Sequence, residues 1–150
     1  MDIKPICENR KARHNYDIEE GLEAGLILLG SEVKSLREGR ANLKDSYCRI
    51  RGREALLFNF HISPYPPARE NHEPDRVKKL LLHKRQMKRL MGKSRERGYT
   101  LIPLKVYFKD GLAKVELALA KGRKAHDKRA AIRKKAEALE ISRAMKSRRR

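Results

Sequence analysis

Apolar and polar residues alternate in short runs along the first 120 residues, which is the pattern of half-buried β-strands. The two-residue segment 52–53 and the three-residue segment 109–111 separate pairs of these runs, and their Gly-Arg and Lys-Asp-Gly sequences are typical of hairpin turns. Five or six short strands joined in this way predict a small β-barrel. The runs cover residues 17–29, 46–51, 54–60, 99–108 and 112–119.

Two segments with helical spacing interrupt the predicted strands. Ser31 can cap a short helix over residues 32–38 that stops at Gly39. Asp75 can cap a longer helix that ends just before Gly92. Residues 64–74 contain four prolines and are therefore predicted to form a loop. The apolar face of the longer helix would consist of Val77, Leu80, Leu81, Met87 and Met91.

Positive charge divides the chain into two parts. Lys and Arg number 38 against 19 Asp and Glu, which gives a formal net charge of +19. Residues 1–120 carry 25 basic and 16 acidic residues, whereas residues 121–150 carry 13 and 3 and contain none of the eight aromatic residues. The second part has too few apolar residues to build a core. We therefore predict a folded body over 1–120 and a basic C-terminal tail over 121–150 that is disordered when free.

The excess charge indicates a polyanionic partner, either nucleic acid or an anionic membrane surface. The longest aliphatic run, residues 26–29, is far shorter than the roughly 20 residues of a membrane span. The N-terminus lacks the layout of a secretory signal, so we expect a cytoplasmic protein. A run as basic as 121–150 is consistent with a localisation signal, with non-specific polyanion binding, or with a tail that folds on an RNA surface.

The sequence offers no support for catalysis. Cys7 and Cys48 are separated by 40 intervening residues without zinc-ligand spacing, and the five histidines are scattered. Phosphate-binding glycine loops and nucleophile-elbow motifs are absent from the sequence. We therefore expect neither an enzyme nor a metal site, and no cofactor.

Three blocks in the body carry residues suited to RNA contact. Residues 9–16 combine cations, amides and an aromatic ring, which either contact phosphates and bases or form a solvated basic arm. Within residues 30–37, Glu32 could accept hydrogen bonds from bases, hold an arginine in place, or act as an ordinary first-turn helix acid. Residues 80–85 begin a cluster of nearly uniform positive charge, which favours phosphate contact over a solvated helix face.

Together the blocks resemble a known family. Asn-Arg-Lys-Ala-Arg-His at 9–14, Gly-x-Glu-Val-Lys-Ser-Leu-Arg at 30–37, Lys-Leu-Leu-Leu-His-Lys-Arg at 79–85 and Lys-Gly-Arg-Lys-x-His-Asp-Lys-Arg at 121–129 closely resemble the bacterial SsrA-binding family, small protein B. The order and spacing of all four blocks fit, and the resemblance covers nearly the whole chain.

This resemblance implies a mainly β fold with short inserted helices, an oligonucleotide-binding-type barrel and a tail that becomes helical when bound. It implies an adaptor of trans-translation that binds the tRNA-like domain of transfer-messenger RNA. The tail would enter the empty mRNA channel of a stalled ribosome near the decoding centre of the small subunit. We expect a monomer bound 1:1 to the RNA. The resemblance places RNA contacts on Asn9, Arg10, Lys11, Arg13, His14, Glu32, Leu81 and His83, and ribosome contacts on Lys121, Gly122, Lys124, His126, Asp127, Lys128, Arg129, Met145 and Lys146.

The alternative hypothesis is a structural ribosomal protein, because a basic barrel with a tail also describes proteins that bind rRNA during assembly. That hypothesis predicts one copy in every ribosome after a high-salt wash. The adaptor hypothesis predicts substoichiometric association that depends on stalling, and co-purification of one small stable RNA.

Overall fold

The computed structural model describes residues 2–96, 98–122, 139 and 141. In these residues the fold is mainly β with short helices, as the sequence predicts, but it has three helices where the sequence predicts two. The helices are α1 (Arg10–Asn15), α2 (Gly30–Arg37) and α3 (Lys84–Ser94). The strands are β1 (Ile3–Glu8), β2 (Tyr16–Ile27), β3 (Ala41–Asn42), β4 (Tyr47–Arg51), β5 (Glu54–Phe58), β6 (His61–Ile62), β7 (Lys78–Leu81), β8 (Tyr99–Lys109) and β9 (Leu112–Gly122).

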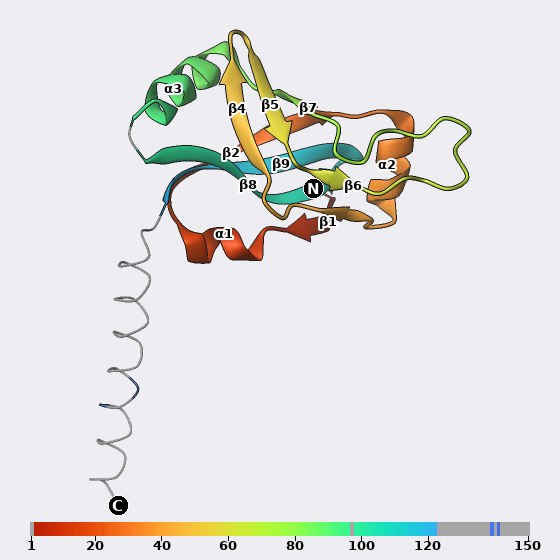
Figure 1. Ribbon diagram of the computed structural model, residues 1–150, viewed down its shortest axis with the longest axis horizontal. Coiled ribbons are helices and arrows are strands. Elements are labelled where there is room, and N and C mark those ends of the chain that lie inside the picture. The colour runs from red at the N-terminus through yellow and green to blue at the C-terminus, as the bar shows by residue number, and fades with distance from the viewer. Residues whose placement is uncertain (1, 97, 123–138, 140, 142–150) are drawn as a thin grey trace, which may run out of the picture.

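The antiparallel sheet closes on itself. Its strand order is β1-β8-β4-β5-β7-β2-β9, and β9 also pairs with β8. This pairing closes β8, β4, β5, β7, β2 and β9 into a ring, and β1 is attached to β8 outside it. Figure 1 places α1 below this ring, α2 at one end and α3 toward the other. The short strands β3 and β6 form a separate pair. Closure removes most free strand edges, which protects the backbone groups of a small sheet from pairing with other chains.

Both predicted hairpins are confirmed. Strands β4 and β5 pair around Gly52, whose φ of 61° matches the first central position of a type II′ turn. Strands β8 and β9 pair around Asp110 and Gly111, which have φ values of 51° and 81°. Two successive positive φ values are the requirement of a type I′ turn, and Asp-Gly is among the pairs that adopt it most readily.

The interior of the ring holds the core. Alternate residues of β4, β5, β8 and β9 point inward, so the period-two pattern of the sequence corresponds to the buried face. Leu36 of α2, Ile62 of β6 and Phe60, which directly precedes β6, belong to the same core cluster. The largest fully buried apolar side chains are Leu36, Leu43, Leu57, Phe60, Ile62, Leu101, Val106, Val115, Leu117 and Leu119.

Helix α2 begins earlier than predicted and is not capped by Ser31. Its N-cap is Leu29, whose backbone N–H donates to Glu32 Oε1 at 2.8 Å. The hydroxyl of Ser31 lies instead 2.8 Å from Nδ1 of the buried His72. As a result Leu28 and Leu29 fall outside the strand that was predicted to run through residue 29. The helix ends at Arg37, and Gly39 follows with a φ of 72°.

The prediction of one long helix capped by Asp75 is wrong. Residues 78–81 form β7, which pairs with β2 on one side and β5 on the other. Lys78 and Leu80 are buried while Lys79 and Leu81 are exposed, so the segment follows strand periodicity. Helix α3 starts only at Lys84 and continues past Gly92 to Ser94. The segment was misassigned because Leu80 and Leu81 also fit helical spacing, and tertiary pairing decides between the two.

The proline-rich segment 64–74 contains no helix or strand, as predicted, and buried polar groups fix its ends. The fully buried Lys78 donates from Nζ to the backbone carbonyls of Phe60 and Pro74, the latter at 3.2 Å. Burial lowers the pKa of Lys78 to about 8, against a smaller raising effect of Glu32. The Nε2 atom of His72 lies 2.8 Å from the carbonyl oxygen of Ile62. These bonds hold the loop against the core.

In the described part of the chain, no helix is long and apolar enough to cross a membrane.

Candidate nucleic-acid interface

The pairing of β8 is interrupted beside a polar hollow next to α1. On one edge, β8 pairs with β1 at Lys105–Lys109 and with β4 only at Leu101. Asn9 fills the interval: its backbone N–H donates to the Leu104 carbonyl at 2.7 Å and its side-chain amide to the Pro103 carbonyl at 3.3 Å. Pro103 itself lacks an N–H and lies at a register shift between β8 and β9. The chain therefore turns from β1 into α1 at this point.

Helix α1, which sequence reasoning left as an arm, displays the first basic block. Ala12 is its one buried residue and packs into a small apolar cluster outside the ring with Ile102, Leu104, Ala118 and Ala120. The other side chains of α1 project from the helix in different directions from Ala12. The exposed ones are Arg10, Lys11, Arg13 and His14. A six-residue helix attached through one alanine thus directs four basic side chains outward.

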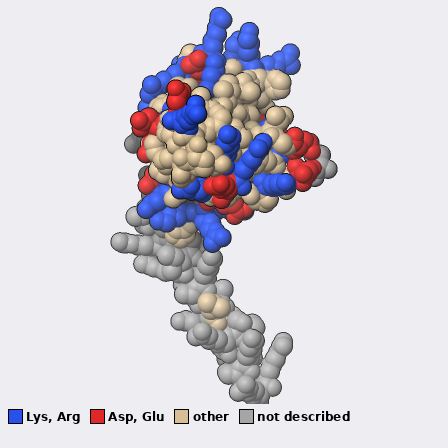
Figure 2. Space-filling model, turned by 90° about the vertical axis from the view of Figure 1, so that its right-hand side faces the viewer, with Lys and Arg blue, Asp and Glu red and all other residues tan. Residues whose placement is uncertain are grey.

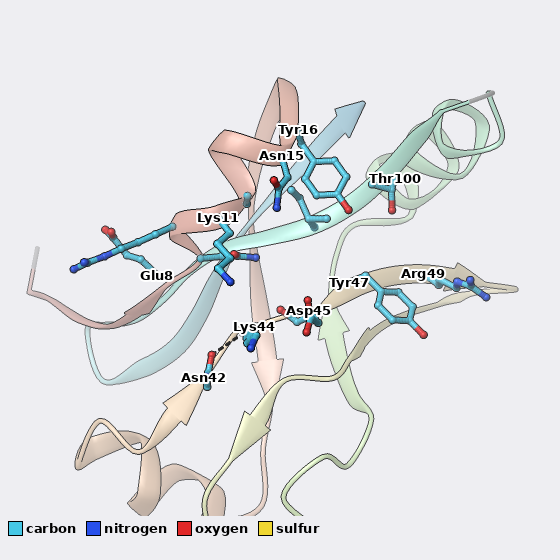
Figure 3. A pocket seen from close by; sticks show the side chains of 15 residues that line it. Glu8, Lys11, Asn15, Tyr16, Asn42, Lys44, Asp45, Tyr47, Arg49 and Thr100 are labelled. Atoms are coloured by element: carbon cyan, nitrogen blue, oxygen red, sulfur yellow. Dashed lines mark hydrogen bonds between the residues drawn. The ribbon is translucent and has the colours of Figure 1, made fainter. Parts of the chain in front are cut away.

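The cleft between α1 and the β3–β4 segment has a volume of about 600 Å³. Figure 3 shows Lys11, Asn15 and Tyr16 pointing from one wall toward the opposite wall. Cations, amides and rings are the groups that bind phosphate, base edges and base faces. The cleft is lined by Glu8, Asn9, Arg10, Lys11, Ala12, Asn15, Tyr16, Asn42, Lys44, Asp45, Ser46, Tyr47, Arg49, Thr100 and Ile102.

The opposite wall of the cleft was not among the predicted site residues. It includes Asn42, Lys44, Tyr47 and Arg49. The side chain of Asn42 accepts a hydrogen bond from the Lys44 N–H at 2.8 Å, which fixes the turn that leads into β4. The alternation of residues 46–51 predicts a strand, and in β4 Tyr47 and Arg49 lie on the face opposite the buried Cys48. It could not predict that this face lies opposite α1, because that depends on ring closure.

Glu32 has a structural partner in this conformation. Its side chain is 0% exposed, and it forms a bidentate ion pair with Arg76, whose Nη2 and Nε lie 2.6 and 3.2 Å from the two carboxylate oxygens. It also accepts the N-cap hydrogen bond of α2. Of the roles considered from sequence, holding an arginine and serving as a first-turn acid are both observed. Any influence on RNA would have to act through Arg76, which is 33% exposed.

Leu81 and His83 lie on another part of the surface. Leu81 is 57% exposed on β7 and packs over Gly25 of β2, where an added Cβ would meet Leu81 at 3.4 Å. His83 is the exposed N-cap of α3, and its backbone N–H donates to Gln86 at 3.1 Å. Of the described residues, those that line the α1 cleft do not include Leu81, His83 or Glu32.

Helix α3 presents the second group of cations. Leu90 is its one buried residue, so most of its circumference faces outward. Arg89 forms an ion pair with Glu20 of β2, which ties the helix to the sheet. The exposed basic side chains of the helix are Lys84, Arg85, Lys88, Arg89 and Lys93.

The outer face of β2 and β8 carries a hydroxyl–carboxylate network. Tyr107 donates to Glu23 Oε2, and Lys109 Nζ lies 3.5 Å from Oε1. The Tyr107 hydrogen bond lowers the pKa of Glu23, and Lys109 adds to the effect. Burial and the hydrogen bond to Glu23 raise the pKa of Tyr107. In the described residues, no cluster of histidine, cysteine and carboxylate side chains is suited to a metal ion.

Only the first two residues of the predicted ribosome-binding block are described. Lys121 and Gly122 are the last residues of β9, and Gly122 pairs with Tyr16 at the start of β2. The Lys121 ammonium lies over the Tyr99 ring, 5.9 Å from its centroid. The other predicted positions, Lys124, His126, Asp127, Lys128, Arg129, Met145 and Lys146, lie outside the described residues.

Comparison with known proteins identifies close relatives. The family described as SmpB protein matches residues 6–147. The SsrA-binding protein of Syntrophobacter fumaroxidans is 61% identical over 145 residues, covering 96% of this chain and 90% of the relative. The SsrA-binding protein of Pelobacter propionicus is 57% identical and covers 100% of this chain and 99% of the relative.

A solved structure is similar over most of its length. It is a chain of the structure described as "tmRNA-SmpB: a journey to the center of the bacterial ribosome". The TM-score is 0.70 with 48% sequence identity, and the match covers 86% of this chain and 95% of the other.

Proposed function

Because the chain belongs to the SmpB protein family, we propose that it is an RNA-binding adaptor of trans-translation. It binds the tRNA-like domain of transfer-messenger RNA, SsrA, and delivers that RNA to stalled ribosomes. It acts by binding and not as an enzyme. The observation that carries this conclusion is the match over residues 6–147, together with relatives that are named SsrA-binding proteins.

The distribution of charge supports this function. Arg10, Lys11, Arg13 and His14 are exposed on α1, and Arg10 and Lys11 line the polar cleft of about 600 Å³. Such a surface neutralises several phosphates while amides and rings contact nucleotides. Asn9 contributes by fixing the start of α1 through its bonds to the Pro103 and Leu104 carbonyls.

We extend the proposal to the fold and the tail. The closed antiparallel ring with its inserted helices is an oligonucleotide-binding-type barrel. The residues after the body form a tail that is disordered when free and helical when bound in the empty mRNA channel, near the decoding centre of the small subunit. The protein works in the cytoplasm as a monomer bound 1:1 to the RNA.

Truncation after Gly122 tests the division of labour between body and tail. This site keeps all of β9, so the β2–β9 pairing through Tyr16 and Gly122 is preserved. The truncated protein should bind the tRNA-like domain within about twofold of the full chain, since α1 and the cleft are intact. It should fail to support tagging of a polypeptide on a ribosome stalled at the end of a message. Loss of RNA binding together with tagging would contradict the division.

The salt dependence of RNA affinity tests the surface itself. Replacing Arg13 by Ala should reduce the slope of log affinity against log salt by about 0.7 to 0.9, the value for one phosphate contact. Arg69→Ala, an exposed arginine of the proline-rich loop, is the matched control and should leave the slope unchanged. An equal slope for wild type and Arg13→Ala would remove Arg13 from the contact surface.

The alternative function is tested by the stoichiometry of the protein on ribosomes. One copy of this protein in every salt-washed ribosome would favour a structural ribosomal protein instead.

A further inference from the structure

The outer face of the β4–β5 hairpin carries a pair of stacked aromatic rings. Tyr47 and Phe58 are directly opposite each other in the register, and their ring centroids lie 5.2 Å apart with 9° between the planes. The neighbouring Cys48 and Leu57 point inward and are buried, so the hairpin is anchored from its other face. Both rings remain partly exposed.

Two guanidinium groups extend the stack. Arg49 lies over the Tyr47 ring at 5.4 Å from its centroid, and Arg51 lies over the Phe58 ring at 5.2 Å. Both arginines are exposed, and neither takes part in an ion pair among the described residues. We call these four residues, Tyr47, Phe58, Arg49 and Arg51, the hairpin platform.

The charge around the hairpin platform is positive. Arg53 in the turn adds a third exposed arginine, while the adjacent carboxylate of Glu54 is paired with Lys79 at 3.2 Å. Figure 2 shows Lys and Arg side chains projecting from the top of the body, where Figure 1 places the β4–β5 turn. A partner of this surface must therefore combine a flat π-face with negative charge.

We propose that the hairpin platform binds an unpaired nucleotide of RNA by stacking its base on the arginine–aromatic column. Nucleotides combine a flat base with a phosphate, and aromatic rings and guanidinium planes are the groups that stack unpaired bases in RNA-binding proteins. Tyr47 and Arg49 also line the α1 cleft, so an RNA held in the cleft can place a nucleotide on the platform. The inference rests on the proposed RNA-binding function and adds a single-stranded element to what the protein recognises.

A stacked cross-strand pair also stabilises a hairpin without any ligand, so the test must report on binding. The chain contains no tryptophan, and Phe58→Trp therefore introduces a single fluorescent reporter that keeps an aromatic ring in the stack. Adding a single-stranded uridine hexanucleotide should quench this fluorescence. The control is Leu112→Trp, at a residue 62% exposed beside the β8–β9 turn, where the same RNA should cause no quenching.

Affinity measurements separate stacking from general charge attraction. Phe58→Leu should weaken binding of the hexanucleotide about 5- to 150-fold, the range expected for loss of one stacked base, whereas Phe58→Tyr should retain it. Binding of a fully paired RNA hairpin of similar charge should change by less than twofold in both variants. If Phe58→Leu does not fold, as judged by circular dichroism, the tryptophan reporter and Phe58→Tyr still decide the question.

The outcomes also separate this inference from the proposed function. Absence of quenching in Phe58→Trp, with the tRNA-like domain still bound by the wild type, would overturn the platform alone. Equal weakening of single-stranded and paired RNA by Phe58→Leu would also overturn it. A wild-type protein that binds neither RNA would overturn both proposals.

Discussion

The ion pair between Glu32 and Arg76 should contribute more to stability than any exposed pair of the body. Arg76→Ala removes the guanidinium that is hydrogen-bonded to the Glu32 carboxylate, which is 0% exposed. Breaking a fully buried pair in this way typically costs about 3–5 kcal/mol. Since Arg76 is itself 33% exposed and Glu32 keeps its bond to the Leu29 N–H, we expect a smaller loss of about 2–3 kcal/mol. For a chain of this size that corresponds to a fall in Tm of roughly 5–10 °C.

Urea unfolding followed by far-ultraviolet circular dichroism measures this loss. Glu32→Gln should cost less than Arg76→Ala, because it removes the buried charge and leaves an arginine that can reach water. The loss of unfolding free energy in the double variant Glu32→Gln/Arg76→Ala should therefore be smaller than the sum of the losses in the two single variants. The matched control is Arg40→Ala: Arg40 and Glu38 form an exposed pair at 3.9 Å, which should contribute less than about 0.5 kcal/mol. A loss below about 0.5 kcal/mol in Arg76→Ala, or a larger loss in Glu32→Gln, would refute the reasoning.

Three other outcomes can be measured on the free protein. Burial lowers the pKa of Lys78 from 10.5 to about 8 in the folded protein. Between pH 8 and pH 10.5, Lys78 is therefore protonated in the unfolded chain and mostly neutral in the folded protein. In urea titrations the stability of the wild type relative to Lys78→Met should rise by up to about 3 kcal/mol from pH 8 to pH 10.5, and a constant difference would contradict this. Burial raises the pKa of Cys7 from 9.0 to about 11. Iodoacetamide at pH 8 should therefore modify Cys7 roughly 100-fold more slowly than a free thiol, as measured by mass spectrometry. Modification at the rate of a free thiol would contradict this prediction. Gly111→Ala should cost about 1 kcal/mol because φ is 81°. Gly30→Ala, at the start of α2 with open space around it, should leave the urea midpoint unchanged or raise it. Equal midpoints for the two variants would rule out backbone strain at Gly111.

The strands that carry their own turn signals could be predicted from sequence. The hairpins around Gly52 and around Asp110–Gly111 were predicted because alternation and turn chemistry are both local. Strand β7 was missed because its four residues also fit a helix, and only pairing with β2 and β5 selects the strand. Strand β1 was missed for a similar reason: its residues are mostly exposed and gain their structure from β8.

In the candidate site, too, the sequence predicted local features but not the long-range contacts. The basic block at residues 9–14 was visible as composition, but its placement on a helix depends on Ala12 fitting against β8 and β9. The arginine that Glu32 holds lies 44 residues away, so no local pattern could name Arg76. The second wall of the cleft required ring closure to bring Tyr47 opposite α1. Sequence reasoning thus identified the chemical groups, and long-range pairing determined which of them meet.

The pairing of Gly122 with Tyr16 gives the two basic segments a common point of origin. Tyr16 directly follows α1, and Gly122 is the last described residue before the basic C-terminal run. The chain therefore leaves the body next to the helix that faces the cleft, and the β2–β9 register fixes that departure point to within one residue. An RNA seated against α1 lies beside the exit of the remaining chain. The proposed RNA-binding helix and the end of β9 therefore share one side of the body.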